Sequence, residues 1–458
     1  MTSKSLAILA GPLLGLITGW AMVVSGWDNA GAWAGGITVW CAIWWIFEPI
    51  PIPITSLLPM ALFPMSGVLT GSQIAASYGH PLIILLMGGA MLSKSMEKTG
   101  THKRLALSMV NAMGGSNPRR VVLGFMVTSA ALSMWISNTA TTLMLLPIAM
   151  AIVSNSGNQS IKVPLLLGIA YAASIGGLAT PIGTPPNLIF LSVYQTTTGA
   201  SASFSQWMLW AMPVVVLFIP ICWWWLTRNI EPGTVGNLEQ VGQWRKAEVR
   251  VLVVFTLTAI AWMTLEEPFG GWTGWFDLPN ANYAAVALIA VIALSVIPDG
   301  EGDRLLDWHS ASSIHWGVLL LFSGGLCIAA AFQETGISLA LAKQLGGLSN
   351  LPTFVIIAVV ALSVTFLTEI TSNTATATVL MPVLAATAVG AGIDPILLMF
   401  PAVLSASCAF MLPVATAPNA IVFGTGELTV KRMAREGLML NLIGAALISV
   451  ISYGLFSA

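Results

Sequence analysis

Long apolar runs follow one another along almost the whole chain, and this pattern restricts it to folds that a lipid bilayer surrounds. Many of the runs reach about 20 residues, the length that an α-helix needs to cross the hydrocarbon core. Asp, Glu, Lys and Arg make up only 8% of the sequence, whereas soluble domains carry about 25%. We therefore predict an all-α polytopic membrane protein that occupies residues 1–458 as a single unit.

Eleven apolar runs are predicted to be transmembrane helices, and two further apolar stretches are predicted to be re-entrant hairpins. These two stretches, at about 118–155 and 352–390, each contain a Ser-Asn-Thr tripeptide in the middle. The halves on either side have about 15 residues, which is short for a full crossing, so each hairpin should enter and leave on one side. The eleven predicted spans lie near residues 5–25, 31–48, 53–70, 76–97, 163–195, 207–227, 246–265, 282–298, 313–335, 395–425 and 433–456.

The distribution of Lys and Arg orients the predicted spans. If the N-terminus is cytoplasmic, 16 of the 17 Lys and Arg residues fall on the cytoplasmic side, as the positive-inside rule requires. Lys343 is the exception, and the C-terminus then ends outside. The predicted cytoplasmic loops lie near residues 94–120, 228–250, 299–310 and 427–435.

The chain contains two copies of one pattern, at residues 76–227 and 313–456. Three motifs recur in the same order and at nearly constant spacing. By the predicted topology the first hairpin enters from the cytoplasm and the second from outside, so we predict inverted repeats, an architecture of transporters. The motif pairs are Met87-Gly88-Gly89 with Ser323-Gly324-Gly325, Ser137-Asn138-Thr139 with Ser372-Asn373-Thr374, and Gly183-Thr184-Pro185-Pro186-Asn187 with Ala415-Thr416-Ala417-Pro418-Asn419.

The last motif pair should break the fifth and tenth predicted spans, because proline removes a backbone donor and obstructs the preceding turn. Non-helical backbone at membrane depth is tolerated only where it lines a cavity or is buried in protein. Its free carbonyl groups suit Na⁺, and the N–H groups at half-helix N-termini suit an anion. The Ser-Asn-Thr tips add hydroxyl and amide groups that can contact either ligand.

The motif segments contain no cationic side chain that could neutralise a bound anion. Lys, Arg and His are absent from residues 121–161, 163–227 and 344–430. A bare anion is costly to bury, so helix dipoles and co-bound cations such as Na⁺ would have to compensate its charge. Glu369 is the one carboxylate close to a motif, and it could aid cation binding, cap the hairpin or face a cavity.

A packing role is the main alternative for these polar residues. A single Ser or Thr in a transmembrane helix usually packs or forms a local hydrogen bond, and a proline in a span is often a plain kink. Two polar motifs that are each duplicated in the same order favour a binding site over these alternatives.

The motifs resemble those of the divalent-anion/sodium symporter family, the sodium:dicarboxylate/sulfate symporters. The resemblance includes the longer C-terminal signature at residues 406–415 and 419–422 and covers nearly the whole chain. It implies a secondary active transporter of the bacterial inner membrane that takes up succinate, malate or fumarate with Na⁺. It also implies a homodimer that works by an elevator mechanism, with a scaffold formed mainly by residues 1–106 and 246–343.

The resemblance further implies which residues bind the ligands. It implies at least two Na⁺ sites and no organic cofactor. One Na⁺ site would use Ser133, Ser137, Asn138 and the carbonyl group of Gly183, and the other Thr368, Asn373 and the carbonyl groups of Thr371 and Ala415. The dicarboxylate would contact Ser137, Asn138, Thr139 and Thr184 on one side, and Ser372, Asn373, Thr374 and Thr416 on the other.

Other functions remain as alternatives. A Na⁺-independent dicarboxylate exchanger of the same family ranks second, because no cationic side chain in the motifs could replace Na⁺. A channel is disfavoured by the paired inverted hairpins, which suit alternating access. An intramembrane enzyme would need a nucleophile and a base, and the motifs contain no His or paired carboxylates. Nucleic-acid binding would need a basic face, whereas the net charge is −1.

Overall fold

The computed structural model describes residues 3–114, 117–155, 158–234, 242–338, 340 and 352–457. These residues form α-helices and one 3₁₀ helix, with no strand among them, which confirms the predicted all-α class. Within this part of the chain, eight helices are long and apolar enough to cross a bilayer. The predicted number of eleven spans stays a prediction.

The helices follow the apolar runs of the sequence. In the first half they are α1 (Ser3–Val24), α2 (Asn29–Phe47), α3 (Ile52–Thr55), α4 (Leu58–Met65), α5 (Gly71–Tyr78), α6 (Pro81–Thr99), α7 (Thr101–Gly114), α8 (Pro118–Ser133), α9 (Asn138–Asn155), the 3₁₀ helix Gln159–Ile161, α10 (Lys162–Gly176), α11 (Pro185–Thr198) and α12 (Phe204–Thr227). In the second half they are α13 (Lys246–Met263), α14 (Gly271–Trp275), α15 (Tyr283–Val296), α16 (Trp308–Ser312), α17 (Trp316–Glu334), α19 (Thr353–Thr368), α20 (Asn373–Gly390), α21 (Ile396–Ala406), α22 (Ala417–Phe423) and α23 (Val430–Phe456).

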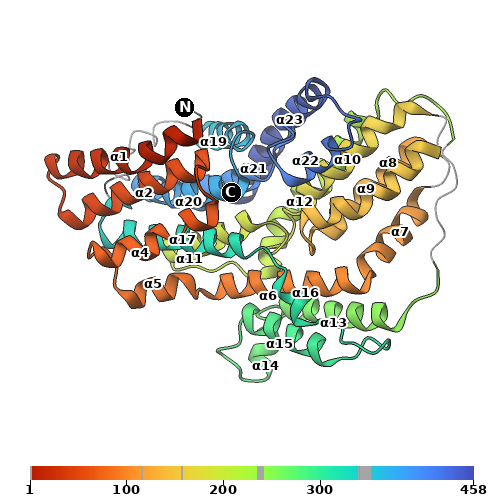
Figure 1. The fold of residues 1–458 in the computed structure, drawn as a ribbon, viewed down its shortest axis with the longest axis horizontal. Coiled ribbons are helices and arrows are strands. Elements are labelled where there is room, and N and C mark those ends of the chain that lie inside the picture. Colours follow the sequence, from red (N-terminus) through yellow and green to blue (C-terminus); the bar gives the residue numbers. More distant parts are fainter. Residues whose placement is uncertain are drawn as a thin grey trace.

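The spacing of the sequence repeat recurs in the helix bounds. The bounds of α17, α19 and α20 are those of α6, α8 and α9 shifted by one constant interval, the same interval that separates the two Ser-Asn-Thr motifs. Each predicted hairpin is a helix pair, α8–α9 or α19–α20, with its turn at the Ser-Asn-Thr motif. Figure 1 shows α8 and α9 at the right of the molecule and α19 and α20 left of its centre. The entry of the two hairpins from opposite sides of the membrane stays a prediction.

The predicted span at residues 53–70 is wrong as one continuous helix. The chain forms two short helices there, α3 and α4, which Ser56 and Leu57 separate. Pro59 explains the interruption, because its ring obstructs the carbonyl group four residues earlier and it has no N–H to donate. Apolar length alone therefore overestimated this span.

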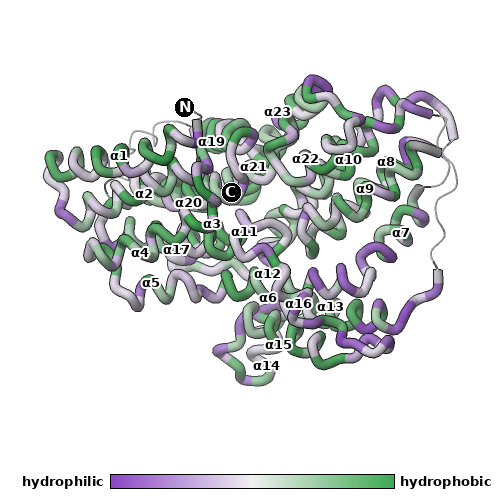
Figure 2. The backbone as a smooth tube through the Cα atoms, viewed as in Figure 1, coloured by the Kyte–Doolittle hydropathy of each residue, from purple (hydrophilic) through white to green (hydrophobic). Residues whose placement is uncertain are grey.

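Hydrophilic residues are frequent around α7, α13 and α16, and also at the start of α23. Figure 2 shows the hydrophilic colour along α7 and around α13 and α16, whereas α1 is mostly hydrophobic. These polar elements coincide with three of the loops that were predicted to face the cytoplasm, so the fold collects those loops on a common region.

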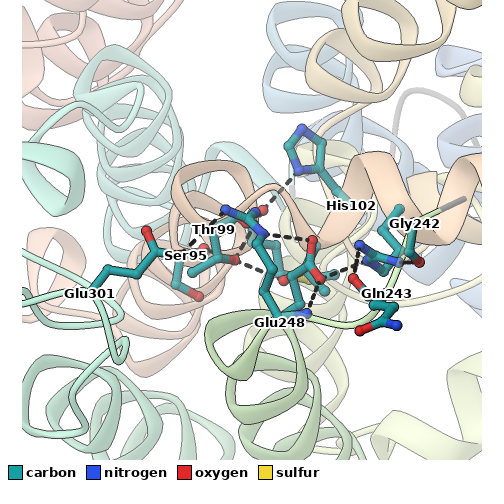
Figure 3. Close-up of polar contacts among 11 residues, drawn as sticks. Ser95, Thr99, His102, Gly242, Gln243, Glu248 and Glu301 are labelled. Atoms are coloured by element: carbon teal, nitrogen blue, oxygen red, sulfur yellow. Dashed lines mark hydrogen bonds and ion pairs between the residues drawn. The ribbon is translucent and has the colours of Figure 1, made fainter.

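A buried ion pair fixes the junction between α6, α7 and α13 in that region (Figure 3). The Glu248 side chain is only 4% exposed, and its carboxylate accepts hydrogen bonds from Arg104 Nε at 2.6 Å and from the Arg245 backbone N–H at 2.7 Å. The Arg245 guanidinium also donates to the Thr99 carbonyl group at the end of α6. Glu248 thus joins the start of α13 to the turn at Gly100, where φ is +74° and α6 ends.

Candidate functional site

A cavity of about 700 Å³ lies where the two hairpin tips and the two broken spans meet. All the predicted site residues line it except two, Ser133 and Thr368. The structure thus brings together four segments that are far apart in the sequence. The predicted residues that line the cavity are Ser137, Asn138, Thr139, Gly183, Thr184, Thr371, Ser372, Asn373, Thr374, Ala415 and Thr416.

Both broken spans have the predicted interruption next to the proline motif. The first is broken at residues 177–184, between α10 and α11, and the second at residues 407–416, between α21 and α22. Thr184 and Thr416 both have extended backbones, as N-cap residues do, before the helix restarts. Thr416 Oγ1 accepts a hydrogen bond from the Asn419 N–H at 3.2 Å, whereas the Thr184 side chain makes no such cap.

Ser133 and Thr368 lie behind the cavity and hold the asparagines that line it. Both are fully buried at the ends of α8 and α19. The Ser133 hydroxyl donates to Asn138 Oδ1, and Thr368 Oγ1 lies 2.7 Å from Asn373 Oδ1. One hydroxyl in each half therefore fixes the orientation of an amide group that faces the cavity.

Oxygen atoms of the first predicted Na⁺ site lie close around the space that a Cβ atom on Gly177 would occupy. A Cβ atom on Gly177 would lie 2.9 Å from Asn138 Oδ1 and 3.1 Å from the Gly183 carbonyl oxygen. Amide, hydroxyl and carbonyl oxygens of this kind coordinate Na⁺ at discontinuous helices. In the second half the spacing of the two proline motifs puts Ala409 at the matching position, so this space depends on glycine in the first half only.

Two buried asparagines hold the backbone of the breaks, and no role had been predicted for them. Asn187 Nδ2 donates to the carbonyl groups of Gly177 at 3.0 Å and Thr180 at 2.8 Å. Asn419 Nδ2 donates to the carbonyl groups of Ala409 at 3.0 Å and Leu412 at 3.1 Å. Their place at the end of both proline motifs was the signal in the sequence.

Charged residues from other segments also line the cavity, which the sequence prediction missed. Lys94 and Glu97 lie on α6 and form an ion pair at 2.7 Å. They come from a segment that had been read only as the end of a span and the start of a cytoplasmic loop, and their shared position at one helix end was the available signal. The other charged or titratable lining residues are Lys4, Glu48 and His315.

Comparison with known proteins places these features in a transporter family. Residues 42–400 match a family described as citrate transporters. A sodium-dependent dicarboxylate transporter, SdcS, of Staphylococcus saprophyticus is 37% identical, over 97% of this chain and 90% of its own. SdcS of Staphylococcus aureus is also 37% identical, over 99% of this chain and 91% of its own.

A solved structure of a membrane transporter has a similar fold. The YdaH transporter of Alcanivorax borkumensis aligns with a TM-score of 0.59, over 84% of this chain and 87% of its own. The sequences are 15% identical in this alignment, so the likeness concerns the fold alone.

Proposed function

The chain belongs to the divalent-anion/sodium symporter family, whose members are membrane transporters, and we propose that it takes up a C4-dicarboxylate together with Na⁺. Succinate, malate and fumarate are the proposed substrates. The similarity to SdcS supports this choice, because both relatives are named as sodium-dependent dicarboxylate transporters.

The observation that carries the proposal is the matched polar lining of one cavity. Asn138, Thr139 and Thr184 line it from the first repeat, and Asn373, Thr374 and Thr416 line it from the second. Two sets of hydrogen-bond donors suit a ligand with a carboxylate at each end. Helices α9, α11 and α20 also begin at the cavity, so their N-terminal N–H groups add positive potential for an anion.

Two Na⁺ ions are proposed to supply the remaining positive charge. The first set of ligands is Ser133, Ser137, Asn138 and the Gly183 carbonyl group, and the oxygens beside Gly177 support it. The second set is Thr368, Asn373 and the carbonyl groups of Thr371 and Ala415. Coupling requires that Na⁺ and dicarboxylate each favour the bound state of the other, and Asn138 and Asn373 belong to both kinds of site.

We propose an elevator mechanism in a homodimer of the bacterial inner membrane, with the N-terminus cytoplasmic and the C-terminus outside. Residues 1–106 and 246–343 would form most of the scaffold, of which residues 1–2, 339 and 341–343 lie outside the described part of the chain. The cavity includes Lys4 and Lys94, which the predicted topology puts at the cytoplasmic side. In that topology this conformation opens to the cytoplasm.

Uptake of radiolabelled succinate into proteoliposomes tests the proposal. We expect uptake with an inward Na⁺ gradient and none when choline replaces Na⁺. Asn138→Ala and Asn373→Ala should each reduce uptake to less than about one tenth, since each removes hydrogen bonds to a charged ligand worth about 1.5–3 kcal/mol.

Leu143→Ala on α9 and Val389→Ala on α20 are matched controls, because both side chains are more than half exposed and lie away from the cavity. Both should transport at the wild-type rate. Uptake that ignores Na⁺ but requires dicarboxylate inside the vesicles would replace symport by exchange. No succinate uptake in either condition would remove the substrate assignment.

A further inference from the structure

Glu369 connects the second hairpin tip to the second broken span. It directly follows α19, and its side chain is buried, with 3% of the residue exposed. Oε1 accepts hydrogen bonds from the backbone N–H groups of Phe410 at 2.7 Å and Met411 at 2.8 Å, and Oε2 accepts one from Leu412 at 2.9 Å. Three consecutive N–H groups of the break are thus satisfied by one carboxylate on the hairpin.

Helix α23 adds a fourth donor to the same carboxylate. Asn441 Nδ2 donates to Glu369 Oε1 at 2.7 Å. One turn earlier, Gly437 lies so close to the break that a Cβ atom there would be 2.1 Å from the Phe410 carbonyl oxygen. All four contacts of Glu369 are N–H donors, which suits an ionised carboxylate because it can only accept. Bonds of this charge-assisted kind are stronger than neutral ones.

The first repeat has no equivalent of this carboxylate. The spacing of the Ser-Asn-Thr motifs puts Met134 opposite Glu369, and the spacing of the proline motifs puts Leu209 opposite Asn441. The corresponding hairpin tip is held to its break by a hydrogen bond from Thr180 Oγ1 to the Met134 carbonyl oxygen at 2.5 Å.

The two N–H groups that match those of Phe410 and Met411 bond to neighbouring residues in the first half. Leu178 donates to the Ile175 carbonyl group at 3.2 Å, and Ala179 donates to that of Gly176 at 3.0 Å. The first break is therefore a self-contained turn, whereas the second depends on a group from the hairpin for its shape.

Glu369 is placed to hold the ligands of the second proposed Na⁺ site together. Thr368 precedes it in the sequence, and Asn373 begins the next helix after the turn. On the side of the break, the Ala415 N–H donates to the Leu412 carbonyl group at 3.2 Å, so Ala415 is tied to a residue that Glu369 holds. The described residues that line the cavity do not include Glu369 itself.

We propose that Glu369 is a positioning residue that keeps the second break, and with it the ligands of the second proposed Na⁺ site, in place before Na⁺ binds. The inference rests on the proposed function, because it concerns one of the two proposed Na⁺ sites. If Glu369 no longer holds the break, the binding-competent arrangement is populated less, so the apparent Na⁺ affinity falls.

Cysteine labelling at matched positions of the two breaks tests the assembly. Val414, which is 83% exposed, and Ile182 occupy equivalent positions, and both line the cavity. The four native cysteines are buried, so the unmodified chain gives the background. With a maleimide reagent, the labelling rate of Val414→Cys should change by less than about twofold when Na⁺ replaces choline, because Glu369 already holds the second break. Ile182→Cys is labelled in parallel as the matched position of the first break.

Adding Glu369→Gln to Val414→Cys should release the second break. In choline, the double variant should be labelled about fivefold or more faster than Val414→Cys alone, because the glutamine amide turns an N–H donor toward backbone N–H donors. Glu369→Asp keeps the acceptors and should give a smaller rise. An unchanged rate in a folded Glu369→Gln protein would overturn the inference, as would a fall of about fivefold or more in the labelling rate of Val414→Cys when Na⁺ replaces choline.

Transport kinetics give an independent readout. Glu369→Gln should raise the half-saturating Na⁺ concentration by about tenfold, with the succinate KM at saturating Na⁺ changed by less than about twofold. Should this variant fail to fold, Asn441→Leu removes one donor and copies the first repeat, and an increase of about threefold is expected. An unchanged Na⁺ requirement in folded protein contradicts the inference.

The two proposals fail in distinguishable ways. If the wild-type chain shows no Na⁺-dependent uptake, the proposed function fails, while labelling in choline alone still reports whether Glu369 holds the second break. If wild-type uptake requires Na⁺ and the Glu369 variants match it, only the positioning role is lost.

Discussion

In the first broken span the backbone packs against backbone, whereas in the second a carboxylate and larger side chains surround it. A Cβ atom on Gly176 would lie 2.3 Å from the Ala130 carbonyl oxygen, and one on Gly183 would lie 2.5 Å from that of Gly177. The second break has Cys408 and Ala415 at the matching positions. Side chains therefore fit in the second break at two positions where the first half has closely packed glycine.

The comparison shows that two halves can present the same lining through different supports. The lining side chains match in type, and the asparagine at the end of each proline motif bonds equivalent carbonyl groups. What differs is how the N–H groups of each break are satisfied. Substitutions at the shared asparagines should therefore destabilise both halves to the same extent. Substitutions at positions that differ between the two breaks should affect the two halves unequally.

The largest effect is expected from the shared asparagines. Asn187→Ala and Asn419→Ala should each cost about 2–6 kcal/mol, since two buried carbonyl groups lose a donor worth about 1–3 kcal/mol each. The yield of monodisperse protein in gel filtration measures the loss. Asn→Asp at each position keeps the size but loses the donor, so it should be as damaging. A folded Asn419→Ala beside an unfolded Asn187→Ala would break the comparison.

An effect of intermediate size is expected at the pair Gly183 and Ala415, where a substitution should reduce uptake in the first half but not in the second. Gly183→Ala puts a methyl group against the Gly177 backbone, and overpacking of this kind costs about 1–3 kcal/mol. Succinate uptake should therefore fall by about tenfold or more. The matched change Ala415→Gly should cost less than about 1 kcal/mol. Equal uptake by both variants would show that the first break can relax, contrary to its close packing.

The smallest effect is expected where the two halves touch. Tyr171 on α10 donates its hydroxyl hydrogen to the Phe410 carbonyl group at 2.6 Å, and both residues are fully buried. Tyr171→Phe should cost about 1 kcal/mol and lower the unfolding midpoint in detergent by about 2 °C. Tyr194→Phe, on a partly exposed ring of α11, is the control and should leave the midpoint unchanged. If Tyr194→Phe lowers the unfolding midpoint more than Tyr171→Phe does, the hydrogen bond of Tyr171 contributes little to stability.

The sequence predicted the residues that line the cavity better than the residues that hold them in place. A polar tripeptide in an apolar run can only be a turn or a lining in a membrane, so both hairpin tips were predictable. The same logic located the two breaks through their prolines. Ser133 and Thr368 do not line the cavity, because they lie behind Asn138 and Asn373 and their hydroxyls contact the side chains of these lining asparagines.

Contacts between distant segments could not be read from the sequence. Glu369 was left with three possible roles, since nothing local indicates that its partners are backbone groups far along the chain, at Phe410 and Leu412. The charged residues of the cavity were missed for the same reason, because Lys4 and Lys94 come to line one cavity only through tertiary packing. The span at residues 53–70 failed because hydropathy does not register the effect of Pro59 on the helix.

The matched lining of the cavity also has a statistical consequence. A dicarboxylate with two identical ends can bind in either of two orientations in the proposed site, because each face offers an asparagine and two threonines. This degeneracy contributes RT ln 2, about 0.4 kcal/mol, to the binding free energy. A ligand with identical ends has this factor in any site, because exchanging its ends gives the same complex. The matched lining extends the second orientation to a substrate with unlike ends, so the duplication of the chain lets either end face either half.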